Sequence, residues 1–161
     1  MKVYFERIDE FSSERTEFYT VRLGNGQITE FELFDQKDFP DHQTELEILY
    51  NVIYEMRGRG AKHFYFKSEG PANALPIVPK EIISCNNIDF GLRLYCIRLT
   101  DNLLVLLNGD IKTQHKPLNC PNVKKHFENA VKIARALDML LNDGEISFVR
   151  DHSLTNIEIE I

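Results

Sequence analysis

The chain of 161 residues lacks long hydrophobic runs, paired cysteines and an overall excess of positive charge. Its longest apolar run, from Leu103 to Leu107, has five residues, whereas a membrane-spanning helix needs about 20. Charged residues interrupt the first seven positions, too early for the apolar core of a signal peptide. We therefore expect a soluble cytoplasmic protein that is neither exported nor bound to a membrane.

Cysteine is scarce, with three residues at Cys85, Cys96 and Cys120. Their odd number and the absence of C-x-x-C spacing argue against a disulfide framework and a closed zinc site. Cys120 and His126 are two metal ligands by type, but they lack a third or fourth ligand nearby, and Cys96 lies in an apolar strand where a core residue is expected. Phosphate-binding loops, dinucleotide fingerprints and common hydrolase motifs are also absent. We expect neither a metal nor a cofactor.

Acidic residues outnumber basic ones, 25 to 19, giving a formal net charge of −6. This total argues against nucleic acid, because phosphate binding relies on Lys and Arg. The distribution is uneven: residues 1–60 carry 7 basic and 13 acidic side chains, residues 61–135 carry 11 and 6, and residues 136–161 carry 1 and 6. A binding partner experiences the local electrostatic field and not the net charge of the whole chain. The basic middle segment is therefore able to attract an anion. A further hypothesis is that the acidic C-terminal segment covers and masks it.

Hydrophobic patterning predicts an α+β fold. Short strands are expected at 3–8, 17–23 and 27–34, with the hairpin signal Asn25-Gly26 before the last of them. Apolar stripes predict helices over 44–57, capped by Asp41 or Thr44, and over 122–141, capped by Asn122. Residues 91–99 and 103–108 are expected to form an antiparallel pair that is buried on both faces. The alternation of Ile and Glu at 157–161 indicates a half-buried strand.

Basic side chains of the middle segment concentrate on and around this expected sheet. They are Lys67, Arg93, Arg98, Lys112, His115 and Lys116. Pairing of the two central strands is expected to bring several of them together. Such a cluster suits RNA cleavage, in which a 2′-hydroxyl is deprotonated, a dianionic transition state is stabilised and the 5′-oxygen is protonated. The alternative is that these charges are ordinary solvated surface.

The run GLRLYCIRL at 91–99, the apolar VLLNG at 105–109 and the following Lys112-Thr113 resemble the central strands of RelE/ParE-type toxins from bacterial toxin–antitoxin pairs. The resemblance covers about residues 44–140. It implies a RelE-like fold, with helices packed on a small antiparallel sheet, and either ribosome-dependent mRNA cleavage or, as in ParE-like members, gyrase inhibition. We expect one domain, with a β-meander or hairpin at 1–40, a RelE-like core at 41–141 and a C-terminal strand or tail at 142–161.

The resemblance also implies roles for individual residues. Arg93 and Lys112 are expected to be the catalytic residues of a metal-independent endoribonuclease, Arg93 by contacting the phosphate. The substrate-binding residues are expected to be Lys67, Arg98, His115 and Lys116. The implied partners are an antitoxin protein and mRNA on the ribosome. No tyrosine follows the final helix and both ends are acidic, so a second hypothesis stays open, a non-catalytic protein-interaction module that retains the toxin-like fold.

Overall fold

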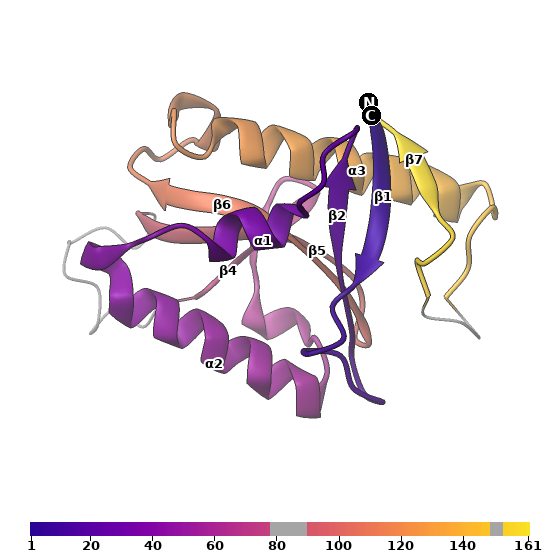
Figure 1. The fold of residues 1–161 in the computed structure, drawn as a ribbon, viewed down its shortest axis with the longest axis horizontal. Coiled ribbons are helices and arrows are strands. Elements are labelled where there is room, and N and C mark those ends of the chain that lie inside the picture. Colours follow the sequence, from indigo (N-terminus) through magenta and orange to yellow (C-terminus); the bar gives the residue numbers. More distant parts are fainter. Residues whose placement is uncertain (78–89, 149–152) are drawn as a thin grey trace.

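The computed structural model describes residues 1–77, 90–148 and 153–161 and contains a seven-stranded sheet (Figure 1). The strands are β1 (Lys2–Arg7), β2 (Glu17–Leu23), β3 (Lys67–Glu69), β4 (Ala72–Leu75), β5 (Gly91–Thr100), β6 (Leu103–Lys112) and β7 (Glu158–Glu160). Their order is β3-β4-β5-β6-β2-β1-β7, and neighbours are antiparallel except for the parallel pair of β2 and β6. The N-terminal strands thus extend the same sheet as the central ones. The predicted α+β class is confirmed.

Helices cover both faces of this sheet, so the molecule has three layers (Figure 1). The α-helices are α1 (Glu30–Asp35), α2 (Gln43–Arg59) and α3 (Lys124–Asn142), and the 3-10 turns are η1 (Pro40–His42), η2 (His63–Tyr65) and η3 (Pro117–Asn119). Ile53 of α2 and Leu104 of β6 belong to one hydrophobic core, whereas Leu137 of α3 and Val105 of β6 belong to the other. Adjacent residues of β6 therefore serve opposite cores.

The central hairpin of β5 and β6 has the predicted antiparallel pairing. Leu94 lies in the core on the α2 side and Tyr95 in the core on the α3 side, which explains the near-continuous apolar sequence. Cys96 is a core residue as expected, and burial raises the pKa of its thiol. The second strand is longer than predicted, because Lys112 still pairs with Gly91. Lys112 therefore lies on a strand and not in the loop after it.

The predicted third N-terminal strand at 27–34 is wrong, because this segment contains α1. The Thr29 hydroxyl accepts a hydrogen bond from the Glu32 backbone N–H at 3.3 Å, and Glu32 Oε2 accepts one from the Thr29 N–H at 2.8 Å. This reciprocal capping box satisfies two N–H groups that the first turn would leave without partners. Phe31 and Phe34, three residues apart on the helix, are both buried. Capping and helical spacing together outweigh the β-propensity of the segment.

The predicted caps of the two long helices are also wrong. α2 begins directly after η1 without a side-chain hydrogen bond from Asp41 or Thr44 at its N-cap. Asn122 does not cap α3, because its side-chain amide donates to the Ile111 carbonyl at 3.1 Å. This contact ties the start of α3 to the end of β6. The Asn122 side chain, which local sequence rules assign to the helix N-cap, therefore makes a tertiary hydrogen bond instead.

The chain ends meet at one edge of the sheet, where β7 pairs with β1 (Figure 1). The Met1 ammonium lies 2.6 Å from Glu160 Oε1. Ile159 is buried between two exposed glutamates, which confirms the predicted half-buried strand. Because β3 forms the opposite edge, β7 does not cover Lys67. The hypothesis that the acidic C-terminal segment masks the basic middle is wrong for this strand.

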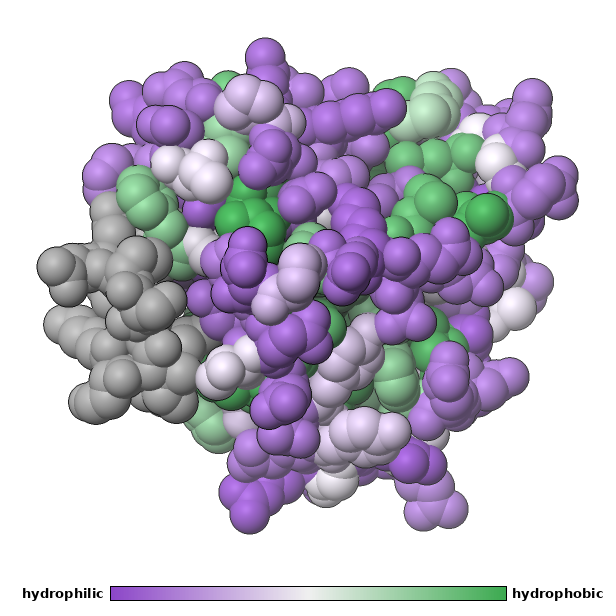
Figure 2. Space-filling model, turned by 60° about the vertical axis from the view of Figure 1, so that its left-hand side comes forward, coloured by the Kyte–Doolittle hydropathy of each residue, from purple (hydrophilic) through white to green (hydrophobic). Residues whose placement is uncertain are grey.

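The surface is mainly hydrophilic on the face that Figure 2 presents. Hydrophobic residues appear there in small, separate areas, and large apolar side chains are mostly enclosed in the two cores. Among the described helices, none has the length and apolar character needed to cross a membrane. That face shows no single continuous apolar patch of the kind that marks large interfaces.

Candidate functional site

A pocket of about 300 Å³ lies between the β3 edge of the sheet, the end of β6 and the start of α3. Three of the predicted site residues, Lys67, Lys112 and His115, line it. The other lining residues are Glu69, Gly70, Pro117 and Phe127. Strand order explains the convergence, because the β3–β4 hairpin adds to the edge of β5 while β6 ends at Lys112 on the other side of β5. The fold thus gathers residues more than forty positions apart.

Glu69 contacts both predicted catalytic cations at the floor of this pocket. Its Oε1 lies 3.2 Å from Lys112 Nζ and 3.7 Å from Arg93 Nε. The three side chains are only 3% to 5% exposed. Arg93 also donates from Nη1 to the carbonyl of Leu92 at 2.9 Å. The expected proximity of Arg93 and Lys112 is present, but it is organised around a carboxylate that the sequence did not single out.

The second carboxylate oxygen of Glu69, Oε2, is buried and has no hydrogen-bond partner within residues 1–77, 90–148 and 153–161. The hydroxyl of Tyr95 is also buried, and it interacts with Glu69. Burial first, and the negative charge of Glu69 second, raise the pKa of Tyr95 and keep its phenol neutral. A buried acceptor without a donor costs free energy. Glu69 Oε2 and the Tyr95 hydroxyl are therefore a buried acceptor and a buried donor, and the Glu69 carboxylate is the acidic group of the pocket lining.

The remaining predicted residues take different positions. His115 is exposed at the pocket, and its ring lies 5.2 Å from that of Phe90. Lys116 is exposed and precedes η3 without lining the pocket. Arg98 lies at the other end of β5, where its Nε donates to the Ala61 carbonyl at 2.6 Å and its guanidinium pairs with Asp101. The expectation that Arg98 joins the cluster of Lys112 is therefore not met.

The pocket combines cations, a carboxylate and an imidazole in one small volume. No family model, curated protein or solved structure matches this chain. Two ammonium groups line the pocket, and the guanidinium of Arg93, which does not line it, lies with Nε 3.7 Å from Glu69 Oε1. Cations of these types bind phosphate oxygens, while carboxylate and imidazole groups exchange protons with hydroxyl groups. The arrangement therefore suits a phosphate ester that carries a neighbouring hydroxyl.

Cys120 and His126, which are metal ligands by residue type, make other contacts. Cys120 Sγ accepts a hydrogen bond from the Thr113 backbone N–H at 3.4 Å. Burial alone would raise the pKa of this thiol, but backbone and hydroxyl donors, Thr113 first among them, lower it overall. Within the part of the chain that the structure describes, no group of three or more His, Cys, Asp and Glu residues is arranged to hold a metal ion. Cys85 lies outside the described residues.

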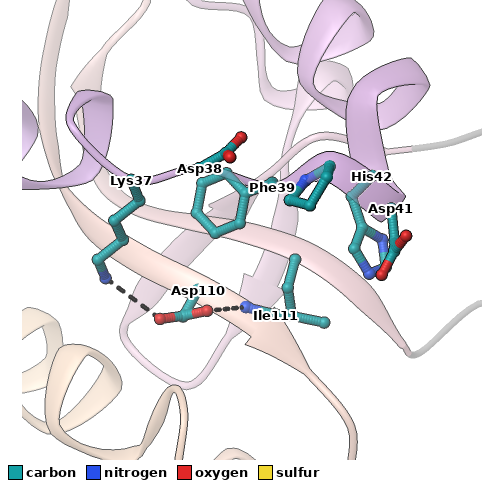
Figure 3. Close-up of a pocket in the computed structure, with 8 residues that line it drawn as sticks. Lys37, Asp38, Phe39, Asp41, His42, Asp110 and Ile111 are labelled. Atoms are coloured by element: carbon teal, nitrogen blue, oxygen red, sulfur yellow. Dashed lines mark hydrogen bonds and ion pairs between the residues drawn. The ribbon is translucent and has the colours of Figure 1, made fainter.

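His126 belongs to a separate polar cluster that was not predicted from the sequence. Lys37 Nζ lies 3.2 Å from His126 Nε2, 3.1 Å from Asn108 Oδ1, 2.6 Å from the Gly109 carbonyl and 3.3 Å from Asp110 Oδ2. Lys37 and Asp110 also line a second pocket of about 410 Å³, where Figure 3 shows them pointing toward one another. The cluster ties the segment after α1 to β6 and α3. Its signal in the sequence is weak, since Lys37 follows α1 among ordinary surface charges.

We expect His126 to make the protein less stable in acid. Burial first, and the charge of Lys37 second, lower the pKa of His126 to about 4, compared with about 6.5 in an unfolded chain. Between these values the unfolded chain binds more protons. The stability that this group contributes is therefore complete above about pH 6.5 and is lost as the pH falls toward about 4.

The test is urea unfolding between those pH values for the wild type and His126→Gln. The slope of the free energy of unfolding against pH is expected to be smaller in the variant, and the difference corresponds to at most about one bound proton. His63→Gln, at an exposed histidine on η2, serves as the control and is expected to retain the wild-type dependence. An unchanged dependence in His126→Gln contradicts the assignment of this pH effect to His126.

Proposed function

We propose that this protein is a RelE-like, metal-independent endoribonuclease of the toxin type, which binds an mRNA phosphodiester in the pocket of Lys67, Lys112 and His115. The observation that carries the proposal is the composition of that pocket. Two ammonium groups, an imidazole and the buried carboxylate of Glu69 line the same space of about 300 Å³. The resemblance at residues 91–113 adds ribosome-bound mRNA as the substrate and an antitoxin protein as the inhibitor.

The chemistry proceeds by transfer of the phosphoryl group within the RNA strand. The Glu69 carboxylate, which lines the pocket, accepts the proton of the 2′-hydroxyl, and the resulting oxygen attacks the adjacent phosphorus. The bond from phosphorus to the 5′-oxygen breaks as His115 gives a proton to that leaving oxygen. The products are a 2′,3′-cyclic phosphate on one fragment and a 5′-hydroxyl on the other. This step consumes no water and no cofactor.

The cations of the pocket stabilise the charge that builds up on the phosphate. Lys112 Nζ lies 3.2 Å from Glu69 Oε1, so a phosphate next to Glu69 lies close to this ammonium group. Arg93 does not line the pocket but adds a buried positive charge beside it, with Nε 3.7 Å from Glu69 Oε1. Lys67, which is partly exposed at the edge strand, binds the phosphate from the solvent side. Fixed cations are most effective when they face charge that develops in the transition state.

The role of Lys67 is tested by measuring RNA binding with Lys67→Ala. A trinucleotide RNA is expected to bind about 5- to 10-fold more weakly, and the slope of log affinity against log salt is expected to fall by about 0.7, since one phosphate contact is lost. Lys132→Ala, at an exposed lysine of α3 away from the pocket, is the matched control and should bind as the wild type does. Fluorescence anisotropy across a salt series measures both quantities. Equal affinities for all three proteins would exclude the pocket as the RNA site.

A non-catalytic interaction module is the second candidate function. The observation in its favour is the near-complete burial of Arg93 and Lys112 against Glu69, since buried ion pairs also serve structural roles. Expression in a bacterial host distinguishes the two candidates. Intact mRNA together with a stably bound antitoxin-like protein favours the module, whereas fragmented mRNA favours the endoribonuclease.

A further inference from the structure

A second group of cations gathers at the end of α2, away from the pocket. This basic corner consists of Arg15, Arg57, Arg59, Lys62 and Arg98. Gly60 lies at its centre with φ +95°, and a Cβ placed there would lie 3.6 Å from Arg15 Nε and 3.7 Å from Lys62 Cε. Arg98 reaches the same turn through its 2.6 Å hydrogen bond to the Ala61 carbonyl. The glycine lets the chain turn tightly, so the cations come from segments far apart in the sequence.

Part of this positive charge is balanced within the basic corner. Asp101 pairs with Lys62 at 2.7 Å and also with Arg98. Glu55 pairs with Arg59 across one helical turn at 3.1 Å. These carboxylates are 42% and 43% exposed, so water screens all three ion pairs. The paired cations therefore still present positive charge to a ligand.

Arg15 and Arg57 supply further positive charge. Both are exposed, and neither makes an ion pair with any residue of the ranges 1–77, 90–148 and 153–161. Ser13 donates to the carbonyl of Arg57 at 2.6 Å, which holds the loop of Arg15 against the end of α2. Even with Glu14 counted beside Arg15, the five cations of the basic corner outnumber its three carboxylates. A protein of net charge −6 thus has a locally positive surface.

Exposed aromatic rings adjoin the basic corner. Phe64 is 63% exposed and Tyr54 is 58% exposed. Tyr54 lies one helical turn before Arg57, on the same side of α2. The ring of Phe64 packs against that of Tyr65 at a centroid distance of 4.5 Å, which limits its motion while leaving it accessible. Cations together with accessible rings are typical of surfaces that bind single-stranded nucleic acid, because the bases stack on the rings.

The chain leads directly from the basic corner to the pocket. Lys62 and Lys67 are five residues apart, so their Cα atoms lie at most about 18 Å from each other. A stacked strand rises about 3.4 Å per nucleotide, so about 5 nucleotides cover that distance and an RNA of about 12 nucleotides is long enough to contact both places. We infer that the basic corner binds the single-stranded RNA that flanks the phosphate held in the pocket. This inference rests on the proposed function and extends it to the class of substrate, a single strand longer than the pocket can hold.

Charge reversal tests the basic corner. Arg57→Glu with Arg59→Glu is expected to weaken binding of an RNA of about 12 nucleotides by at least about tenfold and to reduce its salt slope by about 1.4, as expected for two lost phosphate contacts. A trinucleotide, which fills only the pocket, should bind nearly as it does to the wild type. Phe64→Ala, which removes an exposed ring without changing charge, should weaken binding of the longer RNA about 5- to 10-fold.

The matched control is Lys132→Glu with Arg135→Glu, which makes the same charge change at exposed positions of α3. It is expected to alter the affinity for either RNA by less than about twofold. Equal loss in this control and in the basic-corner variant would overturn the inference, because the effect would then come from net charge. Displacement of the longer RNA by polyglutamate as readily as by unlabelled RNA would also overturn it, in favour of an acidic protein segment.

Two outcomes separate this inference from the proposed function. If the wild type binds the longer RNA no more tightly than the trinucleotide, while Lys67→Ala still weakens both, the basic corner is excluded and the pocket is retained. If Lys67→Ala has no effect on either RNA but the basic-corner variant loses affinity for the longer one, RNA binds at the basic corner and the pocket is excluded.

Discussion

Replacement of His115 by alanine is expected to reduce the rate of RNA cleavage about 100- to 10,000-fold, the range typical of a lost general acid. His115 is exposed where it lines the pocket, so its removal leaves neither hydrophobic core disturbed. The free energy of unfolding is expected to change by less than about 0.5 kcal/mol. The measurement is the initial rate of fragment formation from ribosome-bound mRNA at saturating substrate.

Two controls sharpen this prediction. Lys116→Ala changes the neighbouring exposed residue, which does not line the pocket, and is expected to cleave within about twofold of the wild type. Added imidazole is expected to restore part of the activity of His115→Ala, because a small acid can take the place of the missing ring in proton transfer. Cleavage by His115→Ala at the wild-type rate would exclude His115 as the general acid.

The second large effect is expected at Glu69. Its replacement by alanine removes the carboxylate that lies 3.2 Å from Lys112 Nζ, and both side chains are no more than 5% exposed. Removing one partner of a buried ion pair lowers the free energy of unfolding by about 3 to 5 kcal/mol, because the remaining charge stays buried without a partner and without hydration. The midpoint of urea unfolding should fall accordingly, with little change in the slope of free energy against urea concentration.

The matched control for Glu69→Ala is Glu158→Ala. Glu158 makes a comparable pair with Lys2 at 2.7 Å, but both side chains are about half exposed. Solvent-exposed pairs contribute only about 0.2 to 1 kcal/mol, so this variant is expected to unfold near the wild-type midpoint. Equal effects of the two substitutions would contradict the description of Glu69 as the buried centre of the pocket floor.

The central strands and long helices were predictable because each has a strong local pattern. β5 and β6 are apolar on both faces, and the stripe of α3 carries residues such as Ile133 and Leu137 at helical spacing. The short helix α1 was missed because hairpin and strand signals dominated the residues around it. Its capping box at Thr29 and Glu32 was present in the sequence and, given full weight, identifies the helix.

The extension of β6 was missed for a different reason. The run Asn108-Gly109-Asp110 is typical of a turn, yet it lies within the strand. Gly109 is needed there because β5 approaches closely, and a Cβ at this position would lie 1.8 Å from the Arg93 carbonyl oxygen. A glycine required by a neighbouring strand and a glycine required by a turn look alike in a single sequence.

The pocket was only partly predictable. Lys67, Arg93 and Lys112 were singled out by charge and by the family resemblance, but Glu69 lies in a short segment rich in turn-forming residues and resembles a solvated carboxylate. Its burial arises only when the β3–β4 hairpin joins the edge of β5. Arg98 was misplaced because its distance along β5 from Arg93 carries it to the opposite end of the strand.

The most direct measurement identifies the new ends of an mRNA incubated with the wild-type protein on bacterial ribosomes. The proposed mechanism predicts fragments with 2′,3′-cyclic phosphate and 5′-hydroxyl ends. It also predicts that the same strand with 2′-deoxynucleotides binds but remains uncut, because the attacking oxygen is missing. RNA that stays intact at protein concentrations that saturate binding, or fragments that end in a 3′-hydroxyl, would contradict the mechanism.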